Sequence, residues 1–146
     1  MTPAIPRLAF LSHFVICLAV AGASFFAWIN GVFQTIWVND LSMMTSVIAV
    51  LFVGTALGLG WQAWHVDTAP ETTAEFGHLA ERLSVMAGFV GTAIGLSLQA
   101  RSLAGGATSF TALATSLYTT ACGGAAAALI AILTYSLEAG IRRRRQ

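Results

Sequence analysis

The sequence predicts an all-α membrane protein with four transmembrane helices. Of its 146 residues, 57% are hydrophobic and 9% are charged, whereas a typical soluble domain has about 25% charged residues. Four continuous apolar stretches reach or approach the roughly 20 residues that cross a bilayer as a helix. None has a charge at its centre, and none alternates as a membrane β-strand does. The helices are expected at about 8–29, 41–65, 69–100 and 109–145.

The first apolar stretch has two interpretations. Arg7, an apolar run and the small residues at 21–23 resemble a signal peptide with its cleavage site. The apolar character continues to Trp28, however, which is long enough for a full membrane span. A retained helix is therefore the favoured interpretation.

The arginines predict the orientation of the chain. With four spans, Arg7, Arg82 and the run 142–145 fall on one side, and Arg101 alone falls on the other. Because positive residues concentrate on the cytoplasmic side, both termini are expected in the cytoplasm. Tryptophans favour the membrane interfaces. Trp28 and Trp37 are therefore expected at the outer interface, and Trp61 and Trp64 at the inner one.

The connections predict where the helices begin and how far they extend. An outer turn is expected between Asn30 and Asp40, with Asp40 as the N-cap of the second helix. The spacing in 68–71 is that of a capping box, and a helix running from there to Gln99 would be about 46 Å long. The third helix is therefore expected to project into the cytoplasm, as is the fourth. The projecting part carries Glu71, Glu75, His78, Glu81 and Arg82.

Small residues mark one face of the third helix. Positions 84, 88, 91 and 95 recur at helical spacing. In lipid, close approach through small residues drives helix association, so this face is predicted to pack against another helix. The residues are Ser84, Gly88, Gly91 and Gly95. Packing does not explain Thr92, whose hydroxyl falls near the middle of the same segment.

The fourth helix has a hydroxyl-bearing half followed by a small-residue half. Two interpretations are open for the hydroxyls: interhelical hydrogen bonds, worth about 0.6 kcal/mol each, or the lining of an ion path. Hydroxyls do not carry a proton at neutral pH, and no acidic residue lies in any span, so a proton path needs a carboxylate from another molecule. The hydroxyl-bearing residues are Thr108, Thr111, Thr115, Ser116, Thr119 and Thr120. The small residues that follow are Gly123, Gly124 and 125–128, and both glycines are expected to serve helix packing.

Two segments together resemble the MotA/TolQ/ExbB channel proteins. They are "GFVGTAIGL" at 88–96 and "ATSLYTTACGGAAAALIAILTYSLE" at 114–138. The resemblance covers 83–138 and rests on the order, spacing and short connection of the two motifs. It implies an inner-membrane subunit of bacteria that conducts protons or sodium ions and converts their flow into mechanical motion.

The same resemblance implies an assembly. Residues 1–66 would form two peripheral helices, and 67–146 a pore-lining hairpin. The expected complex is a homopentamer around a dimer of a single-span MotB/TolR/ExbD-like partner, whose membrane aspartate accepts the ion. No cofactor is implied besides the transported ion. The ion pathway implied by position comprises Thr92 and Thr120, with Thr115, Ser116 and Thr119 beside them.

Two departures from the family pattern leave the ion open. Thr115 stands where many TolQ and ExbB proteins have a glutamate, which weakens the case for protons. The doublet Thr119-Thr120 resembles the sodium-driven members, so sodium at Thr92, Thr119 and Thr120 is one expectation, and no other metal site is expected. The short cytoplasmic part argues against a flagellar stator.

Other functions fit less well. A small holin-like pore-forming protein is the alternative, because short length, apolar helices and a basic tail suit it; a four-helix drug exporter normally needs a membrane acid. An enzyme is not expected, since no nucleophile–base pair or metal constellation is present. A net charge of +1 gives no basis for nucleic-acid binding. Isolated residues expected to have structural or solvated roles are Cys17, Cys122, His13, His65 and His78.

Overall fold

The protein is all-helical, as predicted. The computed structural model describes residues 8–65, 74–106 and 110–144. Five helices form in these ranges, one more than expected. They are α1 (Leu8–Ile29), α2 (Val32–Asn39), α3 (Met44–His65), α4 (Glu75–Ala104) and α5 (Phe110–Arg144).

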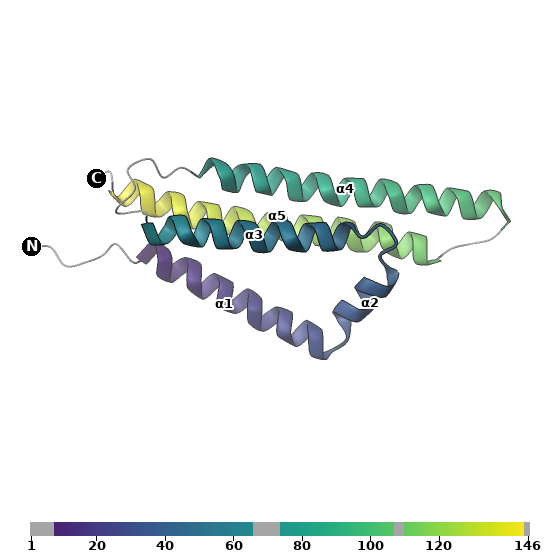
Figure 1. Cartoon of the computed structure of the whole chain (residues 1–146), viewed down its shortest axis with the longest axis horizontal. Helices are drawn as coiled ribbons and strands as arrows, with labels where there is room; N and C mark the ends of the chain where they lie inside the picture. The colour runs from purple at the N-terminus through teal and green to yellow at the C-terminus, as the bar shows by residue number, and fades with distance from the viewer. Residues whose placement is uncertain (1–7, 66–73, 107–109, 145–146) are drawn as a thin grey trace, which may run out of the picture.

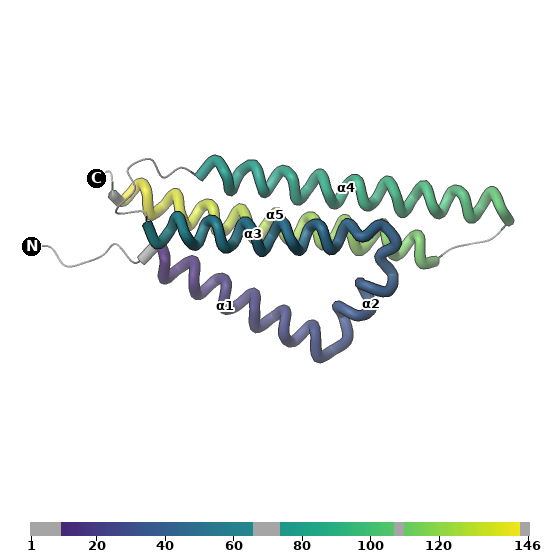
Figure 2. The backbone as a smooth tube through the Cα atoms, in the orientation of Figure 1, coloured from purple at the N-terminus to yellow at the C-terminus, as the bar shows by residue number. Residues whose placement is uncertain are grey.

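A long antiparallel hairpin of α4 and α5 forms the body of the molecule (Figure 1). Helix α3 lies along this hairpin and contacts both of its helices. Helix α1 meets α3 where α1 begins and diverges from it toward α2, which leads the chain back to the bundle (Figure 2). Helix α1 begins at the same end of the molecule at which α5 ends, as an even number of membrane crossings requires.

Among the residues that the structure describes, four helices are long and apolar enough to cross a membrane. Large apolar side chains are exposed along them, including Leu18, Val50 and Phe89 at 62%, 74% and 66% exposure. Such a surface suits lipid, where a helix also satisfies every backbone polar group internally. By length and composition, the chain is a multi-pass membrane protein. The spans are Phe10–Ile29, Met44–His65, Glu75–Ala104 and Phe110–Arg143.

Several helix boundaries differ from the predictions. Helix α3 begins at Met44 rather than near 41, because the preceding residues form a turn around Asp40. Helix α4 continues to Ala104, so Arg101 is helical and not part of the outer loop. The predicted capping box at 68–71 lies outside the described residues, as do Arg7, Thr108 and Arg145.

Helix α2 was not predicted, since its segment was interpreted as an outer turn. Gly31 adopts a left-handed φ of 73° immediately before it, a conformation that glycine reaches without strain. The Thr35 hydroxyl then donates to the Gly31 carbonyl oxygen at 3.0 Å and closes the first turn. The helical spacing of Phe33, Ile36 and Trp37 is the pattern that could have predicted this helix.

The two backbones of the hairpin touch where glycines face each other. A Cβ atom on Gly123 would lie 2.8 Å from the Gly88 Cα and 2.9 Å from the Ser84 carbonyl oxygen. Both distances are too short for a real side chain. The buried positions of α4 all lie on this one face, at 77, 80, 84, 88, 91 and 95. Van der Waals contact between backbones therefore holds the hairpin together.

The other small residues of the hairpin have two different environments. Gly91 provides room for Thr119, whose Cβ would lie 2.6 Å from an added methyl group, and Gly95 does the same for Ser116. Gly124 is different: it is exposed, and an added Cβ would meet no atom within 4 Å. Gly123 and Gly124 are adjacent in sequence but lie inside and outside the interface, respectively.

This difference gives a matched pair of substitutions. Gly123→Ala should lower the free energy of unfolding by about 1–3 kcal/mol, because its methyl group would overlap backbone atoms that cannot move aside. Gly124→Ala should leave it unchanged or raise it by up to about 1 kcal/mol, because alanine is the better helix former. Thermal unfolding in detergent, followed by circular dichroism, measures both. Equal effects of the two substitutions would contradict the packing described here.

Candidate functional site

Two hydroxyls meet across the hairpin. Thr92 on α4 and Thr120 on α5 are hydrogen-bonded to each other through their Oγ1 atoms. Thr92 Oγ1 also lies 2.8 Å from the Gly88 carbonyl oxygen, and Thr120 Oγ1 lies 2.8 Å from that of Ser116. Each hydroxyl has one hydrogen and two lone pairs. Two hydrogens thus serve these three contacts and a longer one of 3.4 Å from Thr92 Oγ1 to the Ser116 carbonyl oxygen, and lone pairs remain available for an additional ligand.

A backbone carbonyl organises this pair. The carbonyl oxygen of Ser116 lies 2.8 Å from the hydroxyl of Thr120, 3.3 Å from that of Thr119 and 3.4 Å from that of Thr92. The three hydroxyls suggested by the sequence for sodium therefore gather around one oxygen of α5. Hydroxyl and carbonyl oxygens are hard ligands, which suit water or a hard cation. The sequence pattern gave no indication that the Ser116 carbonyl would be the shared atom.

The hydroxyl pair lies at the middle of the uncharged part of α4. Thr92 is ten positions from Arg82 and nine positions from Arg101. At 1.5 Å per residue these are about 15 Å and about 14 Å, and the whole stretch matches a hydrocarbon core of about 30 Å. The pair is thus at the depth where a polar group is most costly.

The pair lies at the edge of the hairpin, where the surface is open. Thr120 is exposed and Thr92 is half-buried. Beside Thr120, a stripe of small exposed residues continues along α5, and we refer to Thr120 and this stripe as the open face. The stripe comprises Ala121, Gly124, Ala125 and Ala128.

The remaining predicted pathway residues are buried within the subunit. Ser116 Oγ lies 3.3 Å from the carbonyl oxygens of both Thr92 and Ala112, and it is 4% exposed. Thr119 is fully buried, and its hydroxyl donates to the Thr115 carbonyl oxygen at 2.9 Å. Adjacent on one helix, Thr119 and Thr120 therefore differ: Thr119 packs against Gly91 inside the interface, and Thr120 is outside it.

Thr115 belongs to a different set of contacts. Its Oγ1 lies 2.6 Å from the Asn39 carbonyl oxygen and accepts a hydrogen bond from the Leu41 N–H at 3.2 Å. These contacts attach the segment between α2 and α3 to α5. In this subunit Thr115 therefore fixes the position of a turn.

Asp40 lies in the same turn and is 8% exposed. Its carboxylate accepts hydrogen bonds from the Ser42 hydroxyl at 2.6 Å, the Ser42 N–H at 3.0 Å and the Thr45 N–H at 2.8 Å. The predicted N-cap position is therefore wrong: Asp40 is the C-cap of α2 and lies four residues before α3 begins, but its carboxylate accepts the hydrogen bond of the Thr45 N–H in the first turn of α3. Burial of the carboxyl raises its pKa, but the hydrogen bonds from Ser42 and Thr45 outweigh burial, and the pKa lies below the ordinary value.

The lowered pKa of Asp40 predicts an acid-sensitive turn. Its stabilisation is fully present above the ordinary carboxyl pKa of about 3.9 and is lost as the pH falls through the folded-state pKa. Asp40→Asn should lower the free energy of unfolding by about 0.5–2 kcal/mol at neutral pH, the range for a helix cap. The difference between wild type and variant should shrink as the pH falls below 3.9. Denaturant titrations at several pH values measure it, and a constant difference would contradict this role.

A polar cluster joins α4 and α5 at the far end of the hairpin. Glu138 accepts hydrogen bonds from His78 at 2.8 Å and from Arg142 at 3.1 Å, and all three side chains are at least partly exposed. Exposed ion pairs contribute little free energy. Their position nonetheless indicates that this end of the hairpin is suited to water.

The chemistry available to the site is that of neutral oxygen ligands. In residues 8–65, 74–106 and 110–144, no three His, Cys, Asp or Glu side chains are grouped as a metal site would require. No family model, curated protein or solved structure matches the chain. The resemblance to MotA/TolQ/ExbB proteins therefore rests on the sequence motifs in 83–138 alone.

Proposed function

We propose that this protein is the channel subunit of an ion-driven motor complex of the MotA/TolQ/ExbB type in a bacterial inner membrane. The observation that carries the proposal is the group of Thr92, Thr120 and the Ser116 carbonyl oxygen, which lies at mid-membrane depth beside the open face. Protons or sodium ions would pass along this group, and their flow would drive movement of a partner.

The open face supports assembly with other helices. A hydroxyl that faces lipid has no partner there, and this favours covering it with protein. The small residues that continue from Thr120 allow a neighbouring helix to approach closely. We infer that the hairpins of five copies place their open faces around the single-span helices of a partner dimer, with α1 and α3 on the periphery.

The partner must supply the charged group. The described spans hold no carboxylate between Arg82 and Arg101 or between Phe110 and Glu138. Hydroxyls can replace part of the hydration shell of a cation, but the ion needs a site of opposite charge in the low-dielectric core. An aspartate in the partner's span would serve as this site, and the hydroxyl group would lie beside it.

The lengths of α4 and α5 support a cytoplasmic extension. Their 30 and 35 residues correspond to about 45 Å and about 52 Å, which exceed the hydrocarbon core of about 30 Å. The excess lies at the end with His78 and Glu138. The arginines at 142–145 favour the cytoplasm for that end.

Reporter fusions test this orientation. A reporter after Gln146 should be active in the cytoplasm, and one inserted at Gly105 should be active outside it, because α5 crosses the membrane between them. Paired reporters that work in only one compartment each, such as a phosphatase and a fluorescent protein, give the readout. Both fusions in one compartment would overturn the arrangement and the proposed path with it.

Valine substitutions test the path, because they keep the shape of threonine and remove the hydroxyl. In liposomes that contain the complex with its partner, Thr92→Val and Thr120→Val should each lower ion flux per complex at least tenfold. Stability should fall by only about 0.6 kcal/mol per lost interhelical bond. Thr134→Val is the matched control: it is a fully buried hydroxyl of the same hairpin with no hydrogen-bond partner, so flux should persist.

Further results decide between the alternatives. Normal flux in both valine variants would overturn the site, and a wild-type mass other than five copies, by native mass spectrometry, would overturn the assembly. Separate proton and sodium gradients identify the ion, and loss of sodium flux alone in Thr119→Ala would assign selectivity to the doublet. Depolarisation of cells that express this chain without a partner would instead favour the holin-like alternative.

A further inference from the structure

A second polar bridge joins α4 and α5 on the same edge of the hairpin as Thr92 and Thr120. It is the hydrogen bond between His78 and Glu138. Glu138 follows Thr120 by 18 positions, which are five full turns of a helix with 3.6 residues per turn. The two side chains therefore leave α5 on the same side, and the edge that carries the hydroxyl pair continues to this bridge.

Glu81 lies between the bridge and the hydroxyl pair on α4. It precedes Thr92 by 11 positions, about three turns, and so lies on the same side of the helix. Helix α3 covers the other side, where a Cβ on Gly58 would lie 3.0 Å from the ring of Phe76. His78 is two positions from Phe76 and therefore points nearly the opposite way. Helix α3 thus leaves Glu81 and His78 uncovered.

The distance along α4 places these side chains at the edge of the hydrocarbon core. At 1.5 Å per residue, Glu81 is about 17 Å and His78 about 21 Å from Thr92. Half of a hydrocarbon core is about 15 Å. An ion that moves from the hydroxyl pair toward this end would therefore meet Glu81 and His78 where the core gives way to water.

Two tryptophans of α3 support the same level. Leu137, the neighbour of Glu138 in sequence, packs with Ala63 in one apolar cluster. Ala63 stands between Trp61 and Trp64 in the sequence of α3. Because tryptophans favour the membrane interface, this packing indicates that Glu138 lies near the interface as well.

His78 lies between two carboxylates. Its Nε2 is 2.8 Å from Glu138 Oε1, and its Nδ1 is 3.8 Å from Glu81 Oε2. A carboxylate accepts hydrogen bonds, so Nε2 carries the hydrogen of the neutral ring and Nδ1 is its basic nitrogen. The basic nitrogen thus faces the carboxylate nearer to the hydroxyl pair, and the N–H faces the carboxylate farther from it.

The charges of this cluster balance when it holds one proton on the ring. Besides His78, its ion-paired groups are Glu81, Glu138 and Arg142. With a neutral ring, two negative charges face one positive charge, and an imidazolium makes the sum zero. Other titratable or charged side chains stand near this end of α4 and α5 and form no ion pair with His78 in the described residues: Glu75, Arg82, Tyr135 and Arg143.

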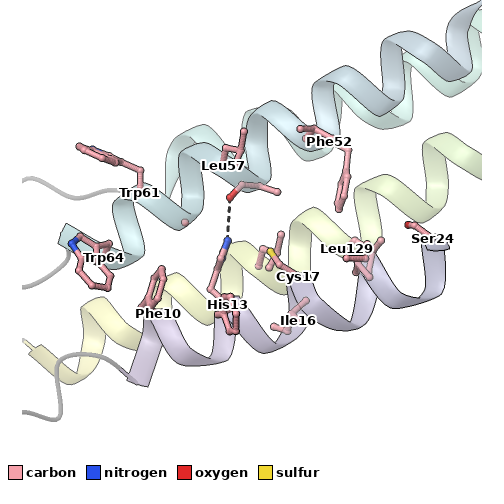
Figure 3. A pocket seen from close by; sticks show the side chains of 17 residues that line it. Phe10, His13, Ile16, Cys17, Ser24, Phe52, Leu57, Trp61, Trp64 and Leu129 are labelled. Carbon is pink, nitrogen blue, oxygen red and sulfur yellow. Dashed lines mark hydrogen bonds between the residues drawn. The ribbon is translucent and has the colours of Figure 1, made fainter. Parts of the chain in front are cut away.

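The other two histidines of the chain have different surroundings. His13 is 4% exposed, and it lines an apolar cavity between α1, α3 and α5, where its Nε2 lies 3.0 Å from the Ala56 carbonyl oxygen (Figure 3). His65 Nδ1 lies 2.9 Å from the Trp61 carbonyl oxygen. Neither belongs to α4 or α5, so His78 is the histidine of the hairpin.

We propose that Glu81, His78 and Glu138 relay protons between the hydroxyl pair and the cytoplasm. This inference rests on the proposed function and adds that the ion is a proton. Histidine takes up and releases protons near neutral pH, and chains of acidic residues and histidines are proton relays in membrane transport. The hydroxyls of Thr92 and Thr120 cannot perform this step, because they do not ionise at neutral pH.

The relay conserves protons at each step. A proton that arrives at Glu81 passes to His78 Nδ1, and the ring becomes an imidazolium between two carboxylates. The Nε2 proton then passes to Glu138 and from there to water. The ring is neutral again, with its hydrogen on Nδ1, and rotation of the ring restores the starting arrangement. One proton enters and one leaves.

Proton flux in liposomes tests the relay. The complex with its partner is reconstituted, a potassium diffusion potential drives protons, and an enclosed pH dye reports flux per complex. His78→Ala should lower the flux by about tenfold or more, and imidazole in solution should restore it, because free imidazole can carry protons in the vacated space. Thr92→Val is the control for leakage by imidazole itself, since imidazole should not restore its flux. Flux of His78→Ala that stays normal, or that imidazole does not raise, would overturn the relay.

Glutamine substitutions separate the relay from a structural role. In Glu138→Gln the amide oxygen still accepts the hydrogen of His78 Nε2 but cannot take up a proton, so flux should fall by about tenfold or more while the complex remains assembled. Glu81→Gln should behave alike. Glu75→Gln removes an exposed acid of the same helix and should leave flux unchanged. Normal flux in Glu81→Gln and Glu138→Gln would overturn the relay.

The same liposomes distinguish failure of the relay from failure of the proposed function. A wild-type complex that conducts sodium ions but not protons would overturn the relay and leave the channel in place. So would normal proton flux in the variants of His78 and Glu138. A wild-type complex that conducts neither ion would overturn the proposed function and the relay with it.

Discussion

The contact between the backbones of α4 and α5 at Gly88 and Gly123 is the constraint on which the rest of the structure depends. In lipid there is little hydrophobic drive for helices to associate, so this close approach must supply the association. The same close approach determines whether short side chains on the two helices can touch. Threonine is short, and Thr92 and Thr120 bond to each other only because the two helix axes are this close. The glycine contact thus accounts for both the packing of the two helices and the hydrogen bond between the two threonines.

The first three helices leave one side of the hairpin uncovered. Thr115 binds the turn between α2 and α3, and the Asp40 carboxylate in that turn accepts a hydrogen bond from the first turn of α3. Together they hold α3 against the hairpin, where Leu59 packs with Leu133 in the apolar core. No described contact of comparable kind reaches the stripe that follows Thr120. The subunit is therefore asymmetric, with a fixed side and an open one.

Much of this was predictable from the sequence, for physical reasons. Long apolar runs predict the four spans, because lipid permits few other structures. Helical spacing alone places Gly88 on the same face as Ser84, Gly91 and Gly95. The remaining features depend on how each helix is rotated in the bundle. Thr119 and Thr120 satisfy the same spacing rules, yet one is buried and the other exposed. Helix α2 and the burial of His13 depend likewise on tertiary contacts that no local pattern contains.

The positions of these hydroxyls bear on their role. Hydroxyls that only hold α4 and α5 together are expected inside the interface between these helices, where the donor and the acceptor belong to the same subunit. Thr119 meets this description, since it is fully buried and bonded to its own helix. Thr120 has equivalent bonds available but lies outside, at mid-membrane depth, next to the small residues of α5. A polar group at that depth on the outer surface is unfavourable for an isolated subunit, and it becomes favourable once water, an ion or another helix meets it. We infer that Thr120 is matched to water, an ion or a helix beyond the subunit, each of which the proposed motor channel would supply.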